Sequence, residues 1–331
     1  MRSARLAAAV AMAGLLALML GCAQEQEEGE GDEAKKLTIA VIPKANVFTF
    51  WPTVKKGAEA AAKELDVEIL WRGAENETSF GQEIEIVEAM IDREVDGIVL
   101  APQSATALVD VVKKAVAAEI PVVIIDSGIN TDVYASFVAT DNYQGGVMGA
   151  ERLATLLAKK GKVALVRNIP GSASTEDREK GFLDTVAKYP DMQVVAKEYG
   201  MGDPTKANEV VSAILTAHPD LSGIFTANEP GAIGALNAVK NAGKVGKVKI
   251  VGFDASPLLI AGIRDGSLDS TIVQDPFQMG YRGVKILVDH IQGKSVAKEV
   301  KTPIELITQD NLATDKIKEH LAAYGVTIEA K

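Results

Sequence analysis

From Leu37 onward, short apolar runs rich in Val and Ile alternate with amphipathic segments whose apolar positions recur every three or four residues. Continuous apolar runs predict strands buried on both faces, and the segments between them have the period of surface helices. The predicted helices include residues 50–65, 80–95, 106–119, 143–160 and 205–218. The predicted strands span residues 37–43, 67–73, 97–102, 121–126, 136–140, 162–168, 192–199, 223–228, 248–254, 270–275 and 302–308.

Strands that alternate with helices form parallel sheets covered by helices on both faces. So many strands exceed what one compact sheet of the nucleotide-binding type holds, and 331 residues are enough for two domains with separate cores. We therefore predict an α/β fold of two Rossmann-like domains, each a doubly wound parallel sheet. The likeness between the two halves is architectural, because no sequence repeat of fixed period relates them.

Polar and aromatic side chains follow nearly every predicted strand. In open parallel sheets, ligands bind beyond the carboxyl ends of the strands. Two such domains that face each other bring both sets of strand ends to one interdomain cleft. The candidate ligand contacts at these positions are Lys44, Asn46, Phe50, Trp51, Gln103, Asp126, Arg178, Asn228, Glu229, Phe253, Asp254 and Gln274.

The chemistry of these side chains suits a small polyhydroxylated ligand. Carboxylates accept hydrogen bonds from hydroxyl groups, amides and arginine donate to them, and an aromatic ring packs on the C–H face of a sugar. Simpler roles remain open for several positions. Asp254 can be a helix N-cap, Arg178 a solvent-facing helix charge, and Phe50 with Trp51 a core pair. We expect Thr140, Asp141 and Asn142 to serve as hinge and helix cap.

The composition excludes several classes of function. A formal net charge of −10 and the absence of a basic stripe exclude nucleic acid as a partner. The three histidines are far apart in the sequence, so we expect no metal. The sequence contains no phosphate-binding or dinucleotide-binding glycine motif, so we expect no cofactor. Without a G-x-S-x-G motif or a cysteine beyond Cys22, nucleophilic catalysis lacks its parts, and we expect no enzyme.

The amino-terminal residues are distinct from the predicted α/β domains. Residues 1–22 have a basic start, an apolar run and a small residue before Cys22, which is typical of a secretory signal peptide. Residues 19–22 resemble a lipoprotein signal-peptidase box, so we expect Cys22 to be lipidated and to anchor the chain to a membrane. A plain secretory signal stays open as the alternative. Residues 23–36 are acidic and lack an apolar pattern, which predicts a disordered tether.

Several segments, in order, resemble the ribose-type periplasmic sugar-binding proteins of ABC transporters. They are IPVVIID, FVATDNYQGG, STEDREKGF, IFTANEPGAIGAL, IVGFDASP and STIVQDPFQMGYRGV. The resemblance implies two lobes joined by a three-stranded hinge, with the ligand in the cleft between them. It implies chain crossings near residues 140–141, 274–275 and 303–306. The lobes would then comprise residues 37–140 plus 275–304, and residues 141–274 plus 305–331.

The same resemblance implies a function. It describes an exported, monomeric protein that captures a monosaccharide or sugar-like solute by hinge closure and delivers it to an ABC transporter permease. A sugar-like signal (autoinducer) bound for a chemoreceptor or sensor is the alternative. A lactose-repressor-type regulator would need a helix-turn-helix where this chain has a signal peptide. An enzyme would need to use Asp126 and Asp254 as an acid–base pair, whereas the resemblance makes both of them hydroxyl acceptors.

The resemblance also assigns individual contacts, with some departures. Its ligand contacts fall where this chain has Asp126, Arg178, Asn228, Phe253, Asp254 and Gln274, and its aromatic pair matches Phe50 and Trp51. Phe48 replaces an asparagine of the ribose binders, Ser127 replaces a second arginine, and no aromatic residue stands near Gly202. Lys44 adds a cation that the ribose type lacks, which favours an acidic or modified sugar.

Overall fold

Two six-stranded sheets form the framework of residues 36–328, the part of the chain that the computed structural model describes. The predictions of a signal peptide, of lipidated Cys22 and of nearly all of the tether lie outside the described residues. Sheet A has the order β11-β5-β4-β3-β1-β2 and sheet B the order β12-β10-β9-β8-β6-β7. Sheet A comprises β1 (Thr38–Ile42), β2 (Glu68–Trp71), β3 (Gly97–Leu100), β4 (Val122–Ile125), β5 (Ser136–Thr140) and β11 (Glu299–Thr302). Sheet B comprises β6 (Gly161–Arg167), β7 (Met192–Tyr199), β8 (Leu221–Thr226), β9 (Lys249–Phe253), β10 (Ser270–Val273) and β12 (Glu305–Thr308).

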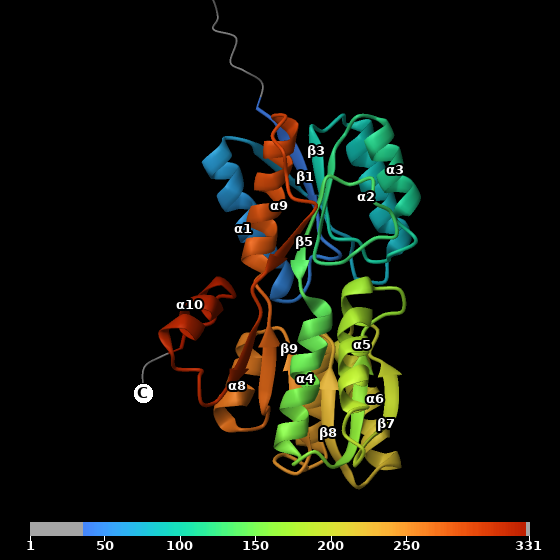
Figure 1. Cartoon of the computed structure of the whole chain (residues 1–331), viewed down its shortest axis with the longest axis vertical. Helices are drawn as coiled ribbons and strands as arrows, with labels where there is room; N and C mark the ends of the chain where they lie inside the picture. The colour runs from blue at the N-terminus through green and yellow to red at the C-terminus, as the bar shows by residue number, and fades with distance from the viewer. Residues whose placement is uncertain (1–35, 329–331) are drawn as a thin grey trace, which may run out of the picture. The chain divides into compact units, whose positions relative to one another are not determined.

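Helices cover both faces of sheet A, which with them makes up the first lobe (Figure 1). One face packs on α1 (Phe50–Leu65) and α9 (Pro276–Ile291), and the other on α2 (Phe80–Asp92) and α3 (Val109–Ala117). The strands β3 and β4 are buried along their whole length, as continuous apolar runs require in a sheet with two covered faces.

Sheet B is built in the same way and forms the second lobe. Two apolar clusters, one on each of its faces, bury its central strands. Its only antiparallel pair among the described residues joins β12 to β10. The helices of this lobe are α4 (Asn142–Leu156), α5 (Ala173–Val186), α6 (Pro204–Ala217), α7 (Glu229–Asn241), α8 (Pro257–Asp265) and α10 (Asp315–Ala323).

Helix starts follow local sequence signals. Asp203, Ser256 and Asp275 each precede a proline, and each accepts a hydrogen bond from a backbone N–H in the first turn of α6, α8 or α9. This arrangement satisfies an N–H that the helix cannot, while proline fits the first turn because its missing N–H is not needed there. Asp141 caps α4 in the same manner, as expected, by accepting from the N–H of Gln144 at 3.1 Å.

The predicted fold class of two parallel-sheet α/β domains is confirmed, and every predicted strand is present. Strand β11 was missed. Its sequence, Glu-Val-Lys-Thr, has no apolar run, and it needs none because it lies at the edge of sheet A with half of its residues exposed.

The chain passes between the two lobes three times. It leaves sheet A after β5 and enters α4, returns after β10 to α9, and crosses again in the short link between β11 and β12. Within residues 36–328, no helix combines the length and the apolar character needed to cross a membrane.

Candidate functional site

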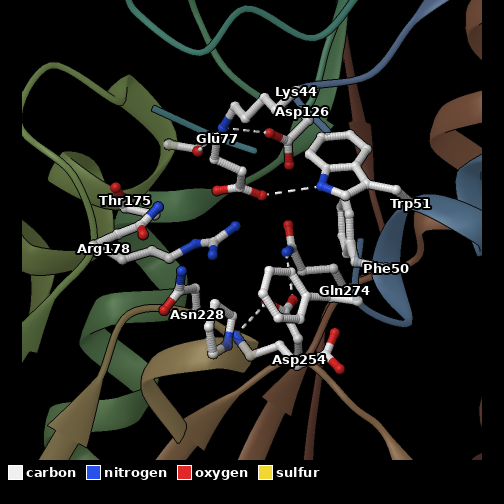
Figure 2. Close-up of a pocket in the computed structure, with 15 residues that line it drawn as sticks. Lys44, Phe50, Trp51, Glu77, Asp126, Thr175, Arg178, Asn228, Asp254 and Gln274 are labelled. Atoms are coloured by element: carbon white, nitrogen blue, oxygen red, sulfur yellow. Dashed lines mark hydrogen bonds and ion pairs between the residues drawn. The ribbon is translucent and has the colours of Figure 1, made fainter. Parts of the chain in front are cut away.

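A cavity of about 370 Å³, part of which is open to solvent, lies where the carboxyl ends of both sheets meet (Figure 2). Each lobe contributes to its walls. The lining residues are Lys44, Phe48, Phe50, Trp51, Glu77, Asp126, Asn168, Ser174, Thr175, Arg178, Asn228, Glu229, Pro230, Asp254 and Gln274.

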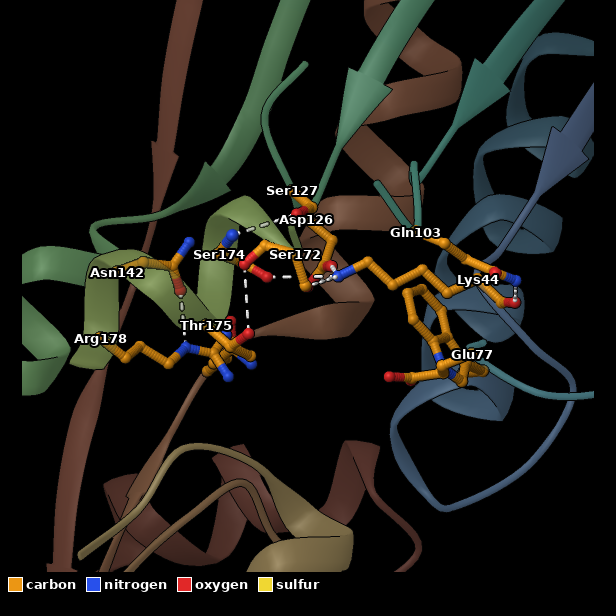
Figure 3. Close-up of polar contacts among 12 residues, drawn as sticks. Lys44, Glu77, Gln103, Asp126, Ser127, Asn142, Ser172, Ser174, Thr175 and Arg178 are labelled. Atoms are coloured by element: carbon orange, nitrogen blue, oxygen red, sulfur yellow. Dashed lines mark hydrogen bonds and ion pairs between the residues drawn. The ribbon is translucent and has the colours of Figure 1, made fainter. Parts of the chain in front are cut away.

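Asp126 follows β4 in the first lobe and pairs with a buried lysine. Lys44 Nζ lies 2.8 Å from Asp126 Oδ2, and both side chains are about 95% buried. The same ammonium donates to Ser174 Oγ at 3.2 Å and to Ser172 Oγ at 3.3 Å, both in the second lobe (Figure 3). Lys44 is therefore neutralised by its own lobe and hydrogen-bonded to the other one.

Ser127 contributes a further contact between the lobes. Its hydroxyl accepts from the backbone N–H of Ser174 at 3.1 Å. An arginine at this position could not accept that hydrogen bond, so the departure at Ser127 goes together with a different contact between the lobes.

Arg178 on α5 is held in place on three sides. Its Nε donates to Asn142 Oδ1 at 2.8 Å and an Nη donates to the carbonyl of Ala227 at 2.8 Å. The guanidinium carbon lies 3.9 Å from the centre of the Phe253 ring, which is a cation–π contact. Burial lowers the pKa of Arg178, whereas the nearby charge of Asp254 raises it.

Asp254 follows β9 in the second lobe and does not cap the helix after it, because Ser256 caps α8. Its Oδ1 accepts from Gln274 Nε2 at 2.6 Å, and its Oδ2 accepts from the backbone N–H of Glu229 at 3.1 Å. Burial raises the pKa of Asp254, and Arg178 counteracts this effect. Two donors therefore hold the carboxylate at the cavity.

Two buried amide oxygens in the lining have no hydrogen-bond partner among the described residues: Gln274 Oε1 and Asn168 Oδ1. Buried polar atoms are almost always satisfied in native proteins, so unsatisfied acceptors beside a cavity indicate a ligand that donates. Asn228 can donate hydrogen bonds to a ligand, whereas these oxygens can only accept them. Its Oδ1 caps α7 by accepting from the N–H of Gly231, which leaves its amide N–H groups for other acceptors.

An aromatic pair forms the opposite wall. The rings of Phe50 and Trp51 lie 4.9 Å apart at 85°, and both are nearly buried at the start of α1. Trp51 Nε1 donates to Glu77 Oε1 at 3.0 Å. Phe48, just before them, has a φ of 65°, which turns the chain sharply into the cavity wall.

Three of the predicted ligand contacts lie outside the lining. Phe253 is fully buried behind Arg178 and supports its guanidinium. Gln103 is also buried, with its Nε2 donating to the carbonyl of Lys44 at 2.5 Å, so it shapes the loop that carries Lys44. Asn46 is exposed, and its amide binds the carbonyl of Gly73 at 3.1 Å. The other predicted contacts line the cavity: Lys44, Phe50, Trp51, Asp126, Arg178, Asn228, Glu229, Asp254 and Gln274.

Some lining residues were missed. Asn168 is the last residue of a predicted strand, so the rule that found the other strand ends could have found it. Ser174 and Thr175 lie one turn before Arg178 on the same helix and share its face. Glu77 lies in the loop after β2, too far from the strand end for that rule, and Pro230 follows the predicted Glu229.

Within residues 36–328, no group of three or more His, Cys, Asp or Glu side chains is placed to hold a metal ion.

Comparisons with known proteins agree with this fold. Residues 39–295 match a family described as "periplasmic binding protein domain". The ribose import binding protein RbsB of Bacillus subtilis is 31% identical over 298 residues, which is 89% of this chain and 96% of that protein. A D-ribose/D-allose-binding protein of Pseudomonas aeruginosa is 33% identical over 83% of this chain and 89% of its own length.

Solved structures agree as well. An ABC transporter solute-binding protein of Agrobacterium vitis bound with α-D-tagatopyranose has a TM-score of 0.84 at 32% identity, covering 89% of this chain and all of that one. Another from the same organism, with bound D-fucose, has a TM-score of 0.83 at 38% identity, covering 85% of this chain and 98% of its own.

Proposed function

The chain belongs to the periplasmic binding protein family, and on this premise we propose how it captures a sugar for an ABC transporter. It is an exported, ribose-binding-like solute-binding protein and not an enzyme. It binds a monosaccharide or sugar-like solute and delivers it to a membrane permease. Both relatives bind sugars, and that of Bacillus subtilis is a ribose import binding protein, so the sensor of a sugar-like signal is not favoured.

One observation carries the assignment of the site. Polar groups that lack partners converge on the cavity from both lobes, among them the buried oxygens of Gln274 and Asn168. Sugar hydroxyls both donate and accept, so they can satisfy these oxygens, the carboxylate of Asp254 and the guanidinium of Arg178 together. The ring of Phe50 or Trp51 would pack on the C–H face of the sugar.

Direct contacts between the lobes support capture by hinge closure. Glu229 in the second lobe accepts from the backbone N–H of Thr49 in the first at 3.1 Å, and the N–H of Ala105 donates to the carbonyl of Gly171 at 2.9 Å. A ligand that contacts both lobes binds the closed form better than the open one and so shifts the population toward it. The moving bodies would be residues 37–140 plus 275–304, and residues 141–274 plus 305–331.

The sugars bound to solved relatives favour a monosaccharide as the ligand. The bound sugars described for the solved relatives, α-D-tagatopyranose and D-fucose, are monosaccharides.

The amino-terminal residues complete the proposal. Residues 1–22 would direct export, Cys22 would carry a lipid, and residues 23–36 would tether a monomeric binding body to the membrane surface. Cys22 is the only cysteine in the chain, so no disulfide within the chain competes for it. Mass spectrometry of the exported protein distinguishes an acylated Cys22 from a plain cleaved terminus.

Thermal unfolding of the full chain tests the binding function. A panel of D-ribose, D-allose, D-arabinose, D-fucose, D-tagatose, D-galactose, D-glucose and xylitol is compared with buffer alone. A ligand at 100 times its Kd adds about 2.7 kcal/mol to the free energy of unfolding, which raises Tm by several degrees. A shift that one sugar produces, and that Asp254→Asn reduces by half or more, supports the proposal. A folded protein that no member of the panel stabilises contradicts it.

A further inference from the structure

Glu77 occupies a position in the cavity that the resemblance assigned to no ligand contact. It lies in the loop between β2 and α2 and is partly exposed, and its carboxylate points into the cavity beside Trp51 (Figure 2). Trp51 Nε1 donates to its Oε1 at 3.0 Å. The indole therefore orients the carboxylate, and no hydrogen bond to Oε2 is recorded among the described residues.

The charges in the lining are unequal. Its two cations are Lys44 and Arg178, and each already has an acidic neighbour in the cavity. Lys44 forms an ion pair with Asp126 at 2.8 Å. Among the acidic groups, Asp254 raises the pKa of Arg178 the most. The remaining lining carboxyl groups are those of Glu77 and Glu229.

Glu77 has no cation of its own. Within residues 36–328, no Lys, Arg or His nitrogen forms an ion pair with it, and its charge raises the pKa of Arg178 less than the charges of Asp254 and Asp126 do. A carboxylate only accepts hydrogen bonds, and a ligand that displaces water from it must supply donors in return. A negatively charged ligand would instead be repelled by the carboxylate of Glu77.

We propose that Glu77 is a further specificity-determining residue, which accepts hydrogen bonds from the hydroxyl groups of an uncharged sugar and excludes sugar acids and sugar phosphates. Trp51 acts through it as a positioning residue. This inference rests on the proposed sugar-binding function and narrows the class of its ligand. It reverses the expectation that Lys44 favours an acidic sugar, because the ammonium of Lys44 is paired with Asp126.

Isothermal titration of the full chain with matched pairs of sugars tests the proposal. The pairs are D-galactose with D-galacturonate, D-glucose with D-glucuronate, and D-ribose with D-ribose 5-phosphate. The wild type is expected to bind the neutral member of a pair and to bind its anionic partner at least about 100-fold more weakly. Hydrogen bonds to charged groups are strong enough for Glu77→Gln to weaken the neutral sugar about tenfold or more.

The ratio of the two affinities is the diagnostic readout. Glu77→Gln keeps the size of the side chain and the oxygen that accepts from Trp51, but removes the charge. It should therefore lower the preference for the neutral sugar by about tenfold, since the anionic partner no longer meets a like charge. Glu75→Gln is the matched control, because Glu75 is exposed in the same loop and absent from the lining. It should leave the ratio unchanged.

The other outcomes are separable. If neutral sugars bind the wild type but Glu77→Gln leaves the ratio unchanged, this inference is wrong and the proposed function stands. The same holds if the anionic member binds the wild type as tightly as the neutral one. If neither member of any pair binds, the proposed function fails and this inference fails with it.

Discussion

Asp126 and Asp254 end corresponding strands of the two lobes in the same left-handed backbone conformation, with φ values of 63° and 69°. Each lies after the third strand of its sheet order, and each donates its backbone N–H to the neighbouring strand, to Val138 or Ile272. Asp and Asn tolerate this conformation, whereas side chains without a polar group near the backbone are strained in it. The two lobes therefore present their carboxylates to the cavity by one shared backbone device.

Asp254→Asn and Asp254→Ala should separate the ligand contact from the backbone. Both variants remove the charge, so both should weaken sugar binding about tenfold or more. Alanine in a left-handed conformation costs a further 1–2 kcal/mol, roughly, and leaves Gln274 Nε2 without its acceptor. Asp254→Asn should therefore be the more stable variant in denaturant unfolding. Equal stability of the two would contradict a role for the backbone conformation.

Each lobe also contains a close helix crossing, α4 with α5 in the second lobe and α1 with α9 in the first. A Cβ on Gly146 of α4 would lie 1.9 Å from the carbonyl oxygen of Arg178 on α5, and one on Gly57 of α1 would lie 2.0 Å from that of Phe277 on α9. Backbone touches backbone in both cases, so neither site can accept a methyl group without moving a helix.

Gly146→Ala should therefore lower both stability and sugar affinity. Overpacking costs roughly 1–3 kcal/mol, and here it displaces the segment of α5 that carries Arg178. Gly57→Ala should cost similar stability with a smaller loss of affinity, since its crossing does not hold Arg178. Gly81→Ala is the neutral control, because a Cβ there meets no atom within 4 Å. Thermal unfolding and titration of the three variants check this order.

Most of the fold was predictable because continuous apolar strands and amphipathic helices leave strong periodic signals. The predicted helix at residues 50–65 agrees with α1 at both ends. Strand β11 left no such signal, because an exposed edge strand buries little apolar surface. The strand-end rule located the cavity for a physical reason too, since the carboxyl ends of parallel strands meet at one edge of a sheet.

The direction of individual side chains was not predictable in this way. Phe253 and Asp254 are neighbours, yet the left-handed turn at Asp254 places its carboxylate at the cavity while Phe253 packs behind Arg178. Gln103 follows a strand but turns toward the loop of Lys44. Glu77 was missed because its place depends on the path of a loop, which periodicity does not report.

A buried carboxyl group beneath the site should make stability depend on pH. Glu83 on α2 accepts from the N–H of Gln103 at 3.0 Å, and burial raises its pKa from 4.5 to about 8. The folded form therefore keeps a proton that the unfolded chain has lost. Glu83 does not lower the free energy of unfolding below about pH 4.5. Between that pH and about pH 8, it lowers this free energy by up to about 1.4 kcal/mol per pH unit.

Glu83→Gln should remove this dependence and raise stability at pH 8 more than at pH 5, since glutamine still accepts from Gln103. Urea unfolding across that range measures the effect. Glu85→Gln, an exposed neighbour on the same helix, should leave the pH profile as it is. A Glu83→Gln profile parallel to that of the wild type would show that Glu83 ionises normally in the folded protein.

Glu229 should make sugar affinity, rather than stability alone, depend on pH. Its carboxyl group accepts from Thr49 across the two lobes, and burial together with the charge of Asp254 raises its pKa to about 8. Opening the cleft separates Glu229 from Thr49 and exposes it, which returns its pKa toward 4.5. Closure therefore takes up a proton between these values, and the closed form loses favour as the pH rises through that window.

Sugar affinity should consequently fall from pH 5 to pH 8 in the wild type and stay nearly constant in Glu229→Gln, which keeps an acceptor for the N–H of Thr49. Titration calorimetry in two buffers of different ionisation enthalpy also counts the protons taken up on binding. Glu83→Gln serves as the cross-control, because it removes a carboxyl group of similarly raised pKa away from the cavity lining. It should alter the pH profile of stability but not that of affinity. Proton uptake that persists in Glu229→Gln would assign the linkage to another group, with buried Asp254 as the next one to test.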